Sequence, residues 1–256
     1  MKYTQGKYII TGKTALAREI YSFEISCPEI AGIAVPGQFV HIRVGNFTLR
    51  RPVSICGIDR QKGTLRIVFE IRGDGTAEIA RLNKGEFIDM LAPLGHGFTV
   101  NHSFGKVVLI GGGIGTPPML SLAAEYGEKA VAVCGFRNSS AVILQEDFKA
   151  SGAEMILCTD DGSAGIHGFV TQPLAELAGN GGIDAVYACG PMPMLRKVAE
   201  ICRENNIYCE VSLEERMACG IGACLGCACR TVRNDEEYFA HVCKDGPVFR
   251  AEEVIW

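Results

Sequence analysis

Residues 106–110 and the glycines after them place the strongest constraint on how this chain folds. After Lys106 the segment is a continuous apolar run, VVLI, without polar alternation. Such a run is typical of a strand buried on both faces of a parallel sheet. Glycines at 111, 112, 113 and 115 follow at once, and a helix is expected over 119–126. Further apolar runs alternate with helical patterns, which predicts an α/β domain. The expected strands are 130–134, 154–158 and 185–189, and the expected helices are 144–149, 172–177 and 191–204.

The chain has a different rhythm before residue 100. Short β-rich runs at 39–44, 65–71 and 87–91 alternate with turns that carry glycine. Many short strands with such turns predict an antiparallel sandwich or barrel, with one helix over 76–82. From about Tyr208 the sequence becomes irregular and rich in glycine and cysteine, with a hairpin expected over 228–242. We therefore expect three units: a β-barrel over 1–101, a nucleotide-fold α/β domain over 102–210, and a small cysteine module over 211–256.

Charge and hydropathy exclude some classes of function. The formal net charge is −4 over 256 residues, which gives no general reason to expect nucleic-acid or anionic-membrane binding. The apolar runs, such as 107–110, are far too short to cross a bilayer. The first twenty residues contain no continuous apolar segment, so we expect no signal peptide and a cytoplasmic protein. In that compartment the twelve cysteines are not expected to form a disulfide framework.

Five of those cysteines cluster near the end of the chain, in CGIGACLGCAC and at Cys243. The spacing Cys219-x4-Cys224-x2-Cys227, with a distant Cys243, is the plant-type ligand pattern of a [2Fe–2S] cluster. Interleaved glycines would let the backbone wrap closely around it. Zinc sites prefer two separated C-x2-C pairs, and zinc or free thiols are the alternatives. Cys229 is expected to pack rather than to bind.

Two loops of the α/β domain are candidates for nucleotide binding. The 111–115 loop follows a strand and opens a helix, the setting in which a helix N-terminus binds phosphate. It departs from G-x-G-x-x-G, and no acidic residue ends the next strand, where Gly135-Phe136-Arg137-Asn138 stands. A structural tight turn is the alternative. Cys189-Gly190-Pro191 ends a later strand, so both loops would face one crevice beyond the carboxyl ends of the strands.

Two segments of the barrel are further candidates. Arg50-Arg51-Pro52-Val53-Ser54 combines arginine and a hydroxyl on an extended segment, which suits an anion and a ring edge. Gly75-Thr76 opens the expected helix and offers a second phosphate-binding N-terminus.

Together these motifs, in this order, resemble the ferredoxin–NAD(P) reductase superfamily. The segment 212–224, SLEERMACGIGAC, is similar to the electron-transfer subunits of class 1B dihydroorotate dehydrogenases. The resemblance covers essentially the whole chain and implies FAD, NAD and a [2Fe–2S] cluster as cofactors. Many of these reductases place tyrosine between the arginine and the serine, where its ring can stack on the flavin. Here Pro52-Val53 intervene, so the stacking partner is not assigned.

The resemblance implies roles for individual residues. FAD would contact the residues Arg51, Pro52, Val53, Ser54, Val68, Phe69, Ile71, Gly75 and Thr76. NAD would contact the residues Gly112, Gly113, Gly115, Thr116, Arg137, Gly190 and Pro191. Cys189 and Glu214 would act beside the nicotinamide and the flavin. The cluster ligands would be Cys219, Cys224, Cys227 and Cys243. NAD rather than NADP follows from the resemblance alone, because Arg137, Asn138, Ser139 and Ser140 could also suit a 2′-phosphate.

The three modules together predict an electron-transfer subunit. Nicotinamide exchanges two electrons as hydride, a [2Fe–2S] cluster exchanges one, and a flavin can do both. The resemblance implies a partner, an FMN-containing dihydroorotate dehydrogenase catalytic subunit, in a heterotetramer of two plus two. The chain itself offers no clear acid–base constellation apart from Cys189 and Glu214. Two alternatives stay open: the electron-transfer subunit of a hydrogenase, sulfide dehydrogenase or bifurcating transhydrogenase, and a redox-sensing cluster protein without turnover.

Overall fold

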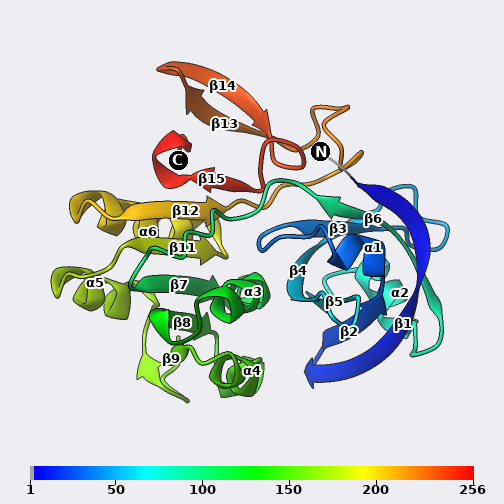
Figure 1. The fold of residues 1–256 in the computed structure, drawn as a ribbon, viewed down its shortest axis with the longest axis horizontal. Coiled ribbons are helices and arrows are strands. Elements are labelled where there is room, and N and C mark those ends of the chain that lie inside the picture. The colour runs from blue at the N-terminus through cyan, green and yellow to red at the C-terminus, as the bar shows by residue number, and fades with distance from the viewer. Residues whose placement is uncertain (1–2) are drawn as a thin grey trace.

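A closed six-stranded antiparallel barrel forms the first part of the chain, as predicted (Figure 1). The computed structural model describes residues 3–256; residues 1 and 2, at the start of the first expected unit, lie outside the described residues. Around the barrel the order is β1, β2, β5, β4, β3, β6. The strands are β1 (Thr4–Ala17), β2 (Ile20–Ser26), β3 (Phe39–Ile42), β4 (Arg51–Asp59), β5 (Thr64–Glu70) and β6 (Phe87–Leu94), with α1 (Pro28–Ala31) and α2 (Asp74–Arg81). Alternate side chains fill the barrel core, as the period of two requires.

A seven-stranded sheet follows, in the order β10, β9, β8, β7, β11, β12, β15. All its pairings are parallel except the last, between β12 and β15. Its first five strands in the chain are β7 (Val107–Gly112), β8 (Ala130–Phe136), β9 (Glu154–Thr159), β10 (Ile166–His167) and β11 (Ala185–Cys189). The helices are α3 (Pro117–Tyr126), α4 (Gln145–Ala150), α5 (Thr171–Gly179) and α6 (Met192–Glu204). One buried cluster joins the sheet to α3 and α4, and another joins it to α5 and α6, so both faces are covered as expected.

The expectation that the chain is irregular from Tyr208 onward is wrong. Tyr208–Ser212 forms β12, which pairs in parallel with β11, and Val248–Arg250 forms β15, which pairs with β12. The expected hairpin is present as β13 (Ala228–Arg233) and β14 (Glu236–His241). β12 was missed because its sequence, YCEVS, is short and carries a glutamate that is nevertheless buried. The cysteine segment therefore leaves the sheet after β12 and returns to it at β15.

The barrel packs directly against the α/β domain. Helix α3 lies against β4, and Cys56 and Val68 of the barrel share a buried cluster with Met119 and the α/β strands. An ion pair between Arg66 of β5 and Asp147 of α4 links the two parts. Within residues 3–256, no helix combines the length and apolar character needed to cross a bilayer. This packing fixes the outer face of the barrel opposite the carboxyl ends of the sheet strands.

Candidate functional site

A cavity of about 210 Å³ lies on the outer face of the barrel and is called the barrel cavity here. Val53 and Phe69 pack in the barrel core, so their neighbours point outward because side chains alternate along a strand. The cavity brings together these predicted residues: Pro52, Val53, Ser54, Val68, Phe69, Thr76 and Glu214. Ile71 packs partly buried against the barrel core instead. The cavity thus joins two barrel strands to the segment after β12.

Arg51 and Gly75 meet at the beginning of α2. A Cβ on Gly75 would overlap the Arg51 guanidinium group, so only glycine allows this approach. Arg51 lies 5.2 Å from the centre of the Phe47 ring and donates to the Leu49 carbonyl oxygen. The Thr76 hydroxyl accepts from the Arg72 N–H at 2.8 Å and donates to the Gly73 carbonyl at 3.0 Å. A helix N-terminus with an arginine beside it is suited to a pyrophosphate.

A larger cavity of about 650 Å³, the glycine-loop cavity, lies beyond the carboxyl ends of β7, β8 and β11. Its lining includes the predicted residues Gly112, Gly113, Gly115, Arg137, Gly190, Pro191 and Glu214. Gly113 has φ +54, and a Cβ there would meet no atom within 4 Å. A Cβ on Gly115 would overlap the Cys189 carbonyl oxygen, so the two predicted loops touch. Phosphate and nicotinamide groups suit this kind of crevice.

Thr116 does not reach the surface of the glycine-loop cavity. It is 0% exposed, and its hydroxyl lies beside the Cys134 thiol below the loop. Its backbone N–H donates to the Gly113 carbonyl at 3.1 Å. The loop therefore presents glycines to the cavity, while the threonine packs beneath them.

Cys189 is buried at the end of β11, with 1% of its surface exposed. Burial raises the pKa of its thiol to about 12; the charge of Glu214 acts in the same direction, and a hydrogen bond with Ser212 opposes it. The group is therefore a neutral thiol at physiological pH. Cys189 lies near the Glu214 carboxylate and the Ser212 hydroxyl but lines neither cavity, so its thiol acts on the site only through these neighbours.

The two cavities adjoin. Arg72, Ile114 and Glu214 line both of them. A ring bound on the barrel and a ring bound at the glycine loop would therefore meet at this boundary. Two flat rings in contact are what hydride transfer between cofactors requires.

Sequence reasoning missed several residues of the glycine-loop cavity. Arg72 and Lys197 supply positive charge, Asp160 supplies a carboxylate, and Phe169 supplies an exposed ring. Arg72 directly precedes Gly73-Asp74-Gly75, and Lys197 lies on α6 after Gly190-Pro191, so proximity to those motifs was the available signal. Asp160 follows β9, whereas the nucleotide-binding pattern places its acidic residue after the neighbouring strand β8.

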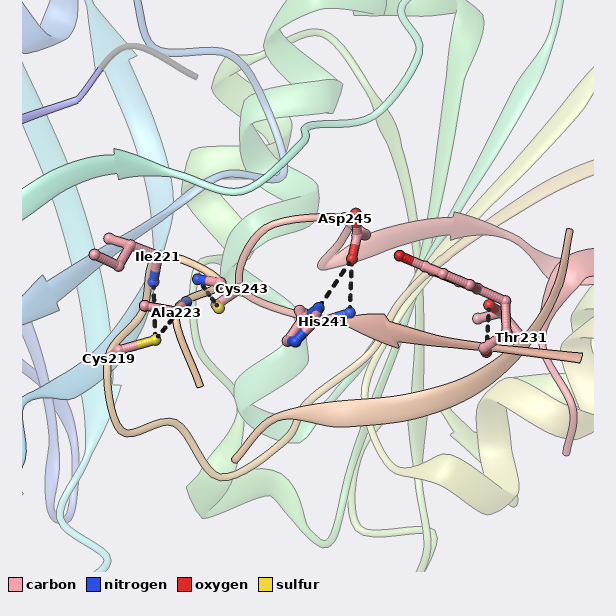
Figure 2. A network of polar contacts seen from close by, with 9 residues as sticks. Cys219, Ile221, Ala223, Thr231, His241, Cys243 and Asp245 are labelled. Atoms are coloured by element: carbon pink, nitrogen blue, oxygen red, sulfur yellow. Dashed lines mark hydrogen bonds and ion pairs between the residues drawn. The ribbon is translucent and has the colours of Figure 1, made fainter. Parts of the chain in front are cut away.

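The cysteine loop directs backbone N–H groups at sulfur, as Figure 2 shows for Cys219 and Cys243. Ile221 and Ala223 donate to the Cys219 sulfur at 3.5 and 3.3 Å. Gly222 donates to the Cys243 sulfur at 3.1 Å. Gly226 likewise donates to the Cys224 sulfur at 3.5 Å. Although burial opposes it, the bonds from Ile221 and Ala223, with the thiol and backbone of Cys224, lower the pKa of Cys219 to about 6. Amides aimed at sulfur stabilise thiolates, which are the form that binds iron.

The four predicted ligands stand in two pairs. Cys224 acts on the pKa of Cys219 and Cys227 acts on the pKa of Cys243, so the members of each pair lie close together. Across residues 3–256, no three His, Cys, Asp or Glu side chains converge on one metal-ion position. A two-iron cluster takes two thiolates on each iron, so two pairs suit it without convergence on a single point. The donor set therefore fits a [2Fe–2S] cluster.

The segment around Cys243 is fixed by its own hydrogen bonds. The Val242 N–H donates to the Cys227 carbonyl at 3.0 Å. Asp245 accepts from the His241 backbone N–H at 2.8 Å, and its carboxylate lies 3.4 Å from His241 Nδ1 (Figure 2). Cys229 lies on β13 opposite Ala240, half-buried, and burial raises the pKa of its thiol to about 11. Cys229 thus lies in the hairpin, in a setting that favours the neutral thiol.

Comparison with known proteins agrees with this arrangement. A family described as "Iron-sulfur cluster binding domain of dihydroorotate dehydrogenase B" matches residues 214–255. A dihydroorotate dehydrogenase B (NAD(+)) electron transfer subunit from Geobacillus thermodenitrificans is 41% identical over 254 residues, with 96% of each chain covered. The same subunit from Fusobacterium nucleatum is 39% identical, with 93% of this chain and 94% of that protein covered.

Solved structures agree on the fold. An NADH-dependent reduced ferredoxin-NADP oxidoreductase, described in terms of flavin-based electron bifurcation, has a TM-score of 0.86 and 31% identity. The match covers 97% of this chain and 90% of that one. A ferredoxin-NADP+ reductase from Plasmodium falciparum has a TM-score of 0.65 at 16% identity, which shows a shared fold.

Proposed function

This chain belongs to the family of electron transfer subunits of NAD-linked dihydroorotate dehydrogenase B, and on that premise we propose that it reduces NAD⁺ with electrons taken from a partner dehydrogenase. The electrons pass through a [2Fe–2S] cluster and FAD. The observation that carries this proposal is the order of the sites. The cysteine loop packs on the barrel at His41, and the barrel cavity adjoins the glycine-loop cavity.

The proposal assigns the cofactors to the residues described above. FAD, when bound, supplies the exchange between an electron pair and single electrons. Arg51, Gly75 and the start of α2 hold its pyrophosphate, while Ser54 and Val68 contact its ring. The 112–115 loop and Gly190 bind NAD, with Arg72 and Lys197 supplying positive charge. Glu214 lies where the two rings meet. The buried, neutral Cys189 thiol lies near the Glu214 carboxylate.

The partner in this proposal is an FMN-containing catalytic subunit that oxidises dihydroorotate to orotate, a step of pyrimidine biosynthesis. We propose a heterotetramer of two plus two in the cytoplasm. The cytoplasm is supported by twelve cysteines, none of which forms a disulfide in residues 3–256.

The test uses the chain with and without its partner. The purified chain is expected to show flavin and cluster absorbance and to oxidise NADH with an artificial acceptor. It should not oxidise dihydroorotate alone, whereas the complex purified from its native cells should couple that oxidation to NAD⁺ reduction. Dihydroorotate oxidation by the isolated chain would overturn the assignment. Absence of steady NADH turnover would favour the redox-sensing alternative.

A second candidate function is supported by one comparison. The bifurcating oxidoreductase covers almost the whole chain at 31% identity. If this chain serves such a complex, its native partner would exchange electrons between reduced ferredoxin and NADP⁺ rather than oxidise dihydroorotate. Mass spectrometry of the purified native complex identifies the second subunit, and assays with both substrate sets distinguish the two functions.

A further inference from the structure

His41 is a buried polar residue that the sites above do not use. It lies on β3, and its strand neighbours Val40 and Ile42 pack in the barrel core. Because side chains alternate along a strand, the imidazole of His41 points out of the barrel. Phe39, on the same side of β3, packs in the buried cluster that contains Cys243. His41 therefore faces the part of the molecule that carries the cysteines.

The cysteine loop closes over this imidazole at Gly220. Gly220 has φ +74, and a Cβ there would overlap His41 Nδ1 and lie 3.0 Å from Cε1. The side chain of His41 is 0% exposed. Gly220 directly follows Cys219, so the ring lies against the segment that carries the first predicted ligand.

Neither ring nitrogen of His41 makes a hydrogen bond of normal geometry among residues 3–256, although the Arg50 backbone lies near the ring. A buried donor left unpaired costs about 1–3 kcal/mol. A neutral imidazole has one N–H to donate. The acceptors gathered by this loop are sulfur atoms, since Cys219 and Cys243 already accept backbone N–H groups. A bound cluster would add its own sulfides to that set.

We propose that His41 donates its N–H to a sulfur of the cluster held by Cys219, Cys224, Cys227 and Cys243, and that this bond raises the reduction potential of the cluster. The proposal rests on the proposed function, because it requires the cluster. Hydrogen bonds to sulfur are among the factors that set cluster potentials. An N–H donor stabilises the reduced form, which carries the additional negative charge.

The position of His41 also suits electron transfer between the two cofactors. It pairs with Pro52 across β3 and β4, so the two side chains lie on the same face of the barrel. Pro52 lines the barrel cavity, where the flavin is proposed to bind. His41 is thus fully buried between its strand partner Pro52, which lines that cavity, and Gly220 of the cysteine loop.

The first experiment measures the potentials of both cofactors in the holoprotein. His41→Phe keeps a ring of similar size without an N–H, and His41→Gln keeps a donor. We expect His41→Phe to make reduction of the cluster about tenfold less favourable, which is about 59 mV for a one-electron couple. His41→Gln should recover most of that loss. The flavin potential should stay unchanged, and His102→Phe, at an exposed histidine, is the matched control.

The second experiment observes the bond in the unmodified protein, and the variants identify which histidine provides it. Histidine labelled with ¹⁵N in its ring is incorporated into the unmodified protein, and pulsed electron paramagnetic resonance is recorded on the reduced cluster. A ¹⁵N coupling that is present in the unmodified protein and disappears in His41→Gln and His41→Phe supports the bond. No ¹⁵N coupling, an unchanged cluster potential in His41→Phe, or a shift of the flavin potential instead would overturn it. Failure to find iron and sulfide in the unmodified protein would overturn the proposed function itself, and is thereby distinguished.

Discussion

Individual glycines decide whether the three candidate sites can form. At Gly75 the space for a Cβ is taken by Arg51, at Gly115 by the Cys189 backbone, and at Gly220 by His41. In each case the contact joins two segments far apart in the chain. A methyl group at any of them would force apart the groups that the site needs together.

Gly75→Ala is expected to weaken FAD binding. The added Cβ displaces the Arg51 guanidinium group from the start of α2, and we expect FAD affinity to fall about fivefold, which corresponds to about 1 kcal/mol. Fluorescence of released flavin during dialysis measures the effect. Gly179→Ala is the control, because a Cβ at Gly179 meets no atom within 4 Å. Equal flavin retention by both variants would contradict the proposed pyrophosphate site.

Cys227→Ser is expected to abolish the cluster, and Cys229→Ser to retain it. Cys227 belongs to the sulfur pair with Cys243, whereas Cys229 lies in the hairpin opposite Ala240. Iron and acid-labile sulfide content, with visible absorbance, measures both variants. Loss of the cluster in Cys229→Ser would show that the ligand set is wrong.

Two loop–helix junctions meet at the level of secondary-structure elements. The loop between β7 and α3 contacts the end of β11 through Gly115, and Pro191 and Met194 at the beginning of α6 lie against Gly112. These contacts set the shape of the glycine-loop cavity. Because β7 and β11 are hydrogen-bonded neighbours in the sheet, the two loops are held in fixed register.

Gly115→Ala is therefore expected to raise the KM for NADH by about tenfold or more. A loss of about 1.4 kcal/mol in the free energy of NADH binding, caused by the displaced loops, is enough for a tenfold change. Flavin and cluster content should stay at the level of the unmodified protein, because the added methyl group meets the Cys189 and Gly190 backbone, away from the residues proposed to hold FAD and the cluster. Steady-state NADH oxidation with a dye measures KM and kcat. An unchanged KM would mean that NAD does not bind against this junction.

The sequence predicted elements better than their contacts. The apolar strands and their glycine loops were predicted because continuous burial leaves a clear signal, as at β7 and β11. The strand β12 escaped prediction because Glu210 is buried through bonds from the Thr99 N–H and the Tyr208 hydroxyl, which sequence does not reveal. The sequence likewise did not indicate that His41 has a functional role. Its importance depends on Gly220, distant in the chain. The roles of the candidate site residues stay predictions.

At the scale of the whole molecule, buried thiols couple stability to pH. Burial raises the pKa of Cys56 to about 12; Asp147 adds to the rise and Arg66 opposes it. A thiol with a raised pKa contributes stability that is complete below the unfolded pKa, near 9, and is lost as pH rises toward 12. Cys56 lies where the barrel meets α4, so its ionisation would act on the joint between them.

Cys56→Ala is expected to lose less stability than the unmodified protein between pH 8 and about pH 10.5. The difference should be about 2 kcal/mol, since each pH unit above the unfolded pKa contributes about 1.4 kcal/mol. Urea unfolding followed by flavin fluorescence at both pH values measures it. Ile55→Val is the control, because it creates a buried space next door without removing a titrating group. Identical pH dependence in Cys56→Ala and the unmodified protein would rule out this thiol.

Because the chain rejoins the sheet at β15, the segment between β12 and β15 can be replaced in an engineered protein. Ser212 and Val248 are register partners, so the chain leaves the sheet edge and comes back to it at the same rung. Everything between them, including the cysteine loop and the hairpin, is an excursion from two adjacent strand ends. A two-residue turn can join such ends. Replacing this segment would leave the strand pairings of the barrel and of the seven-stranded sheet in place, and a different electron carrier could be attached between Ser212 and Val248 if it also covered the core that Leu213 and Cys243 now cover.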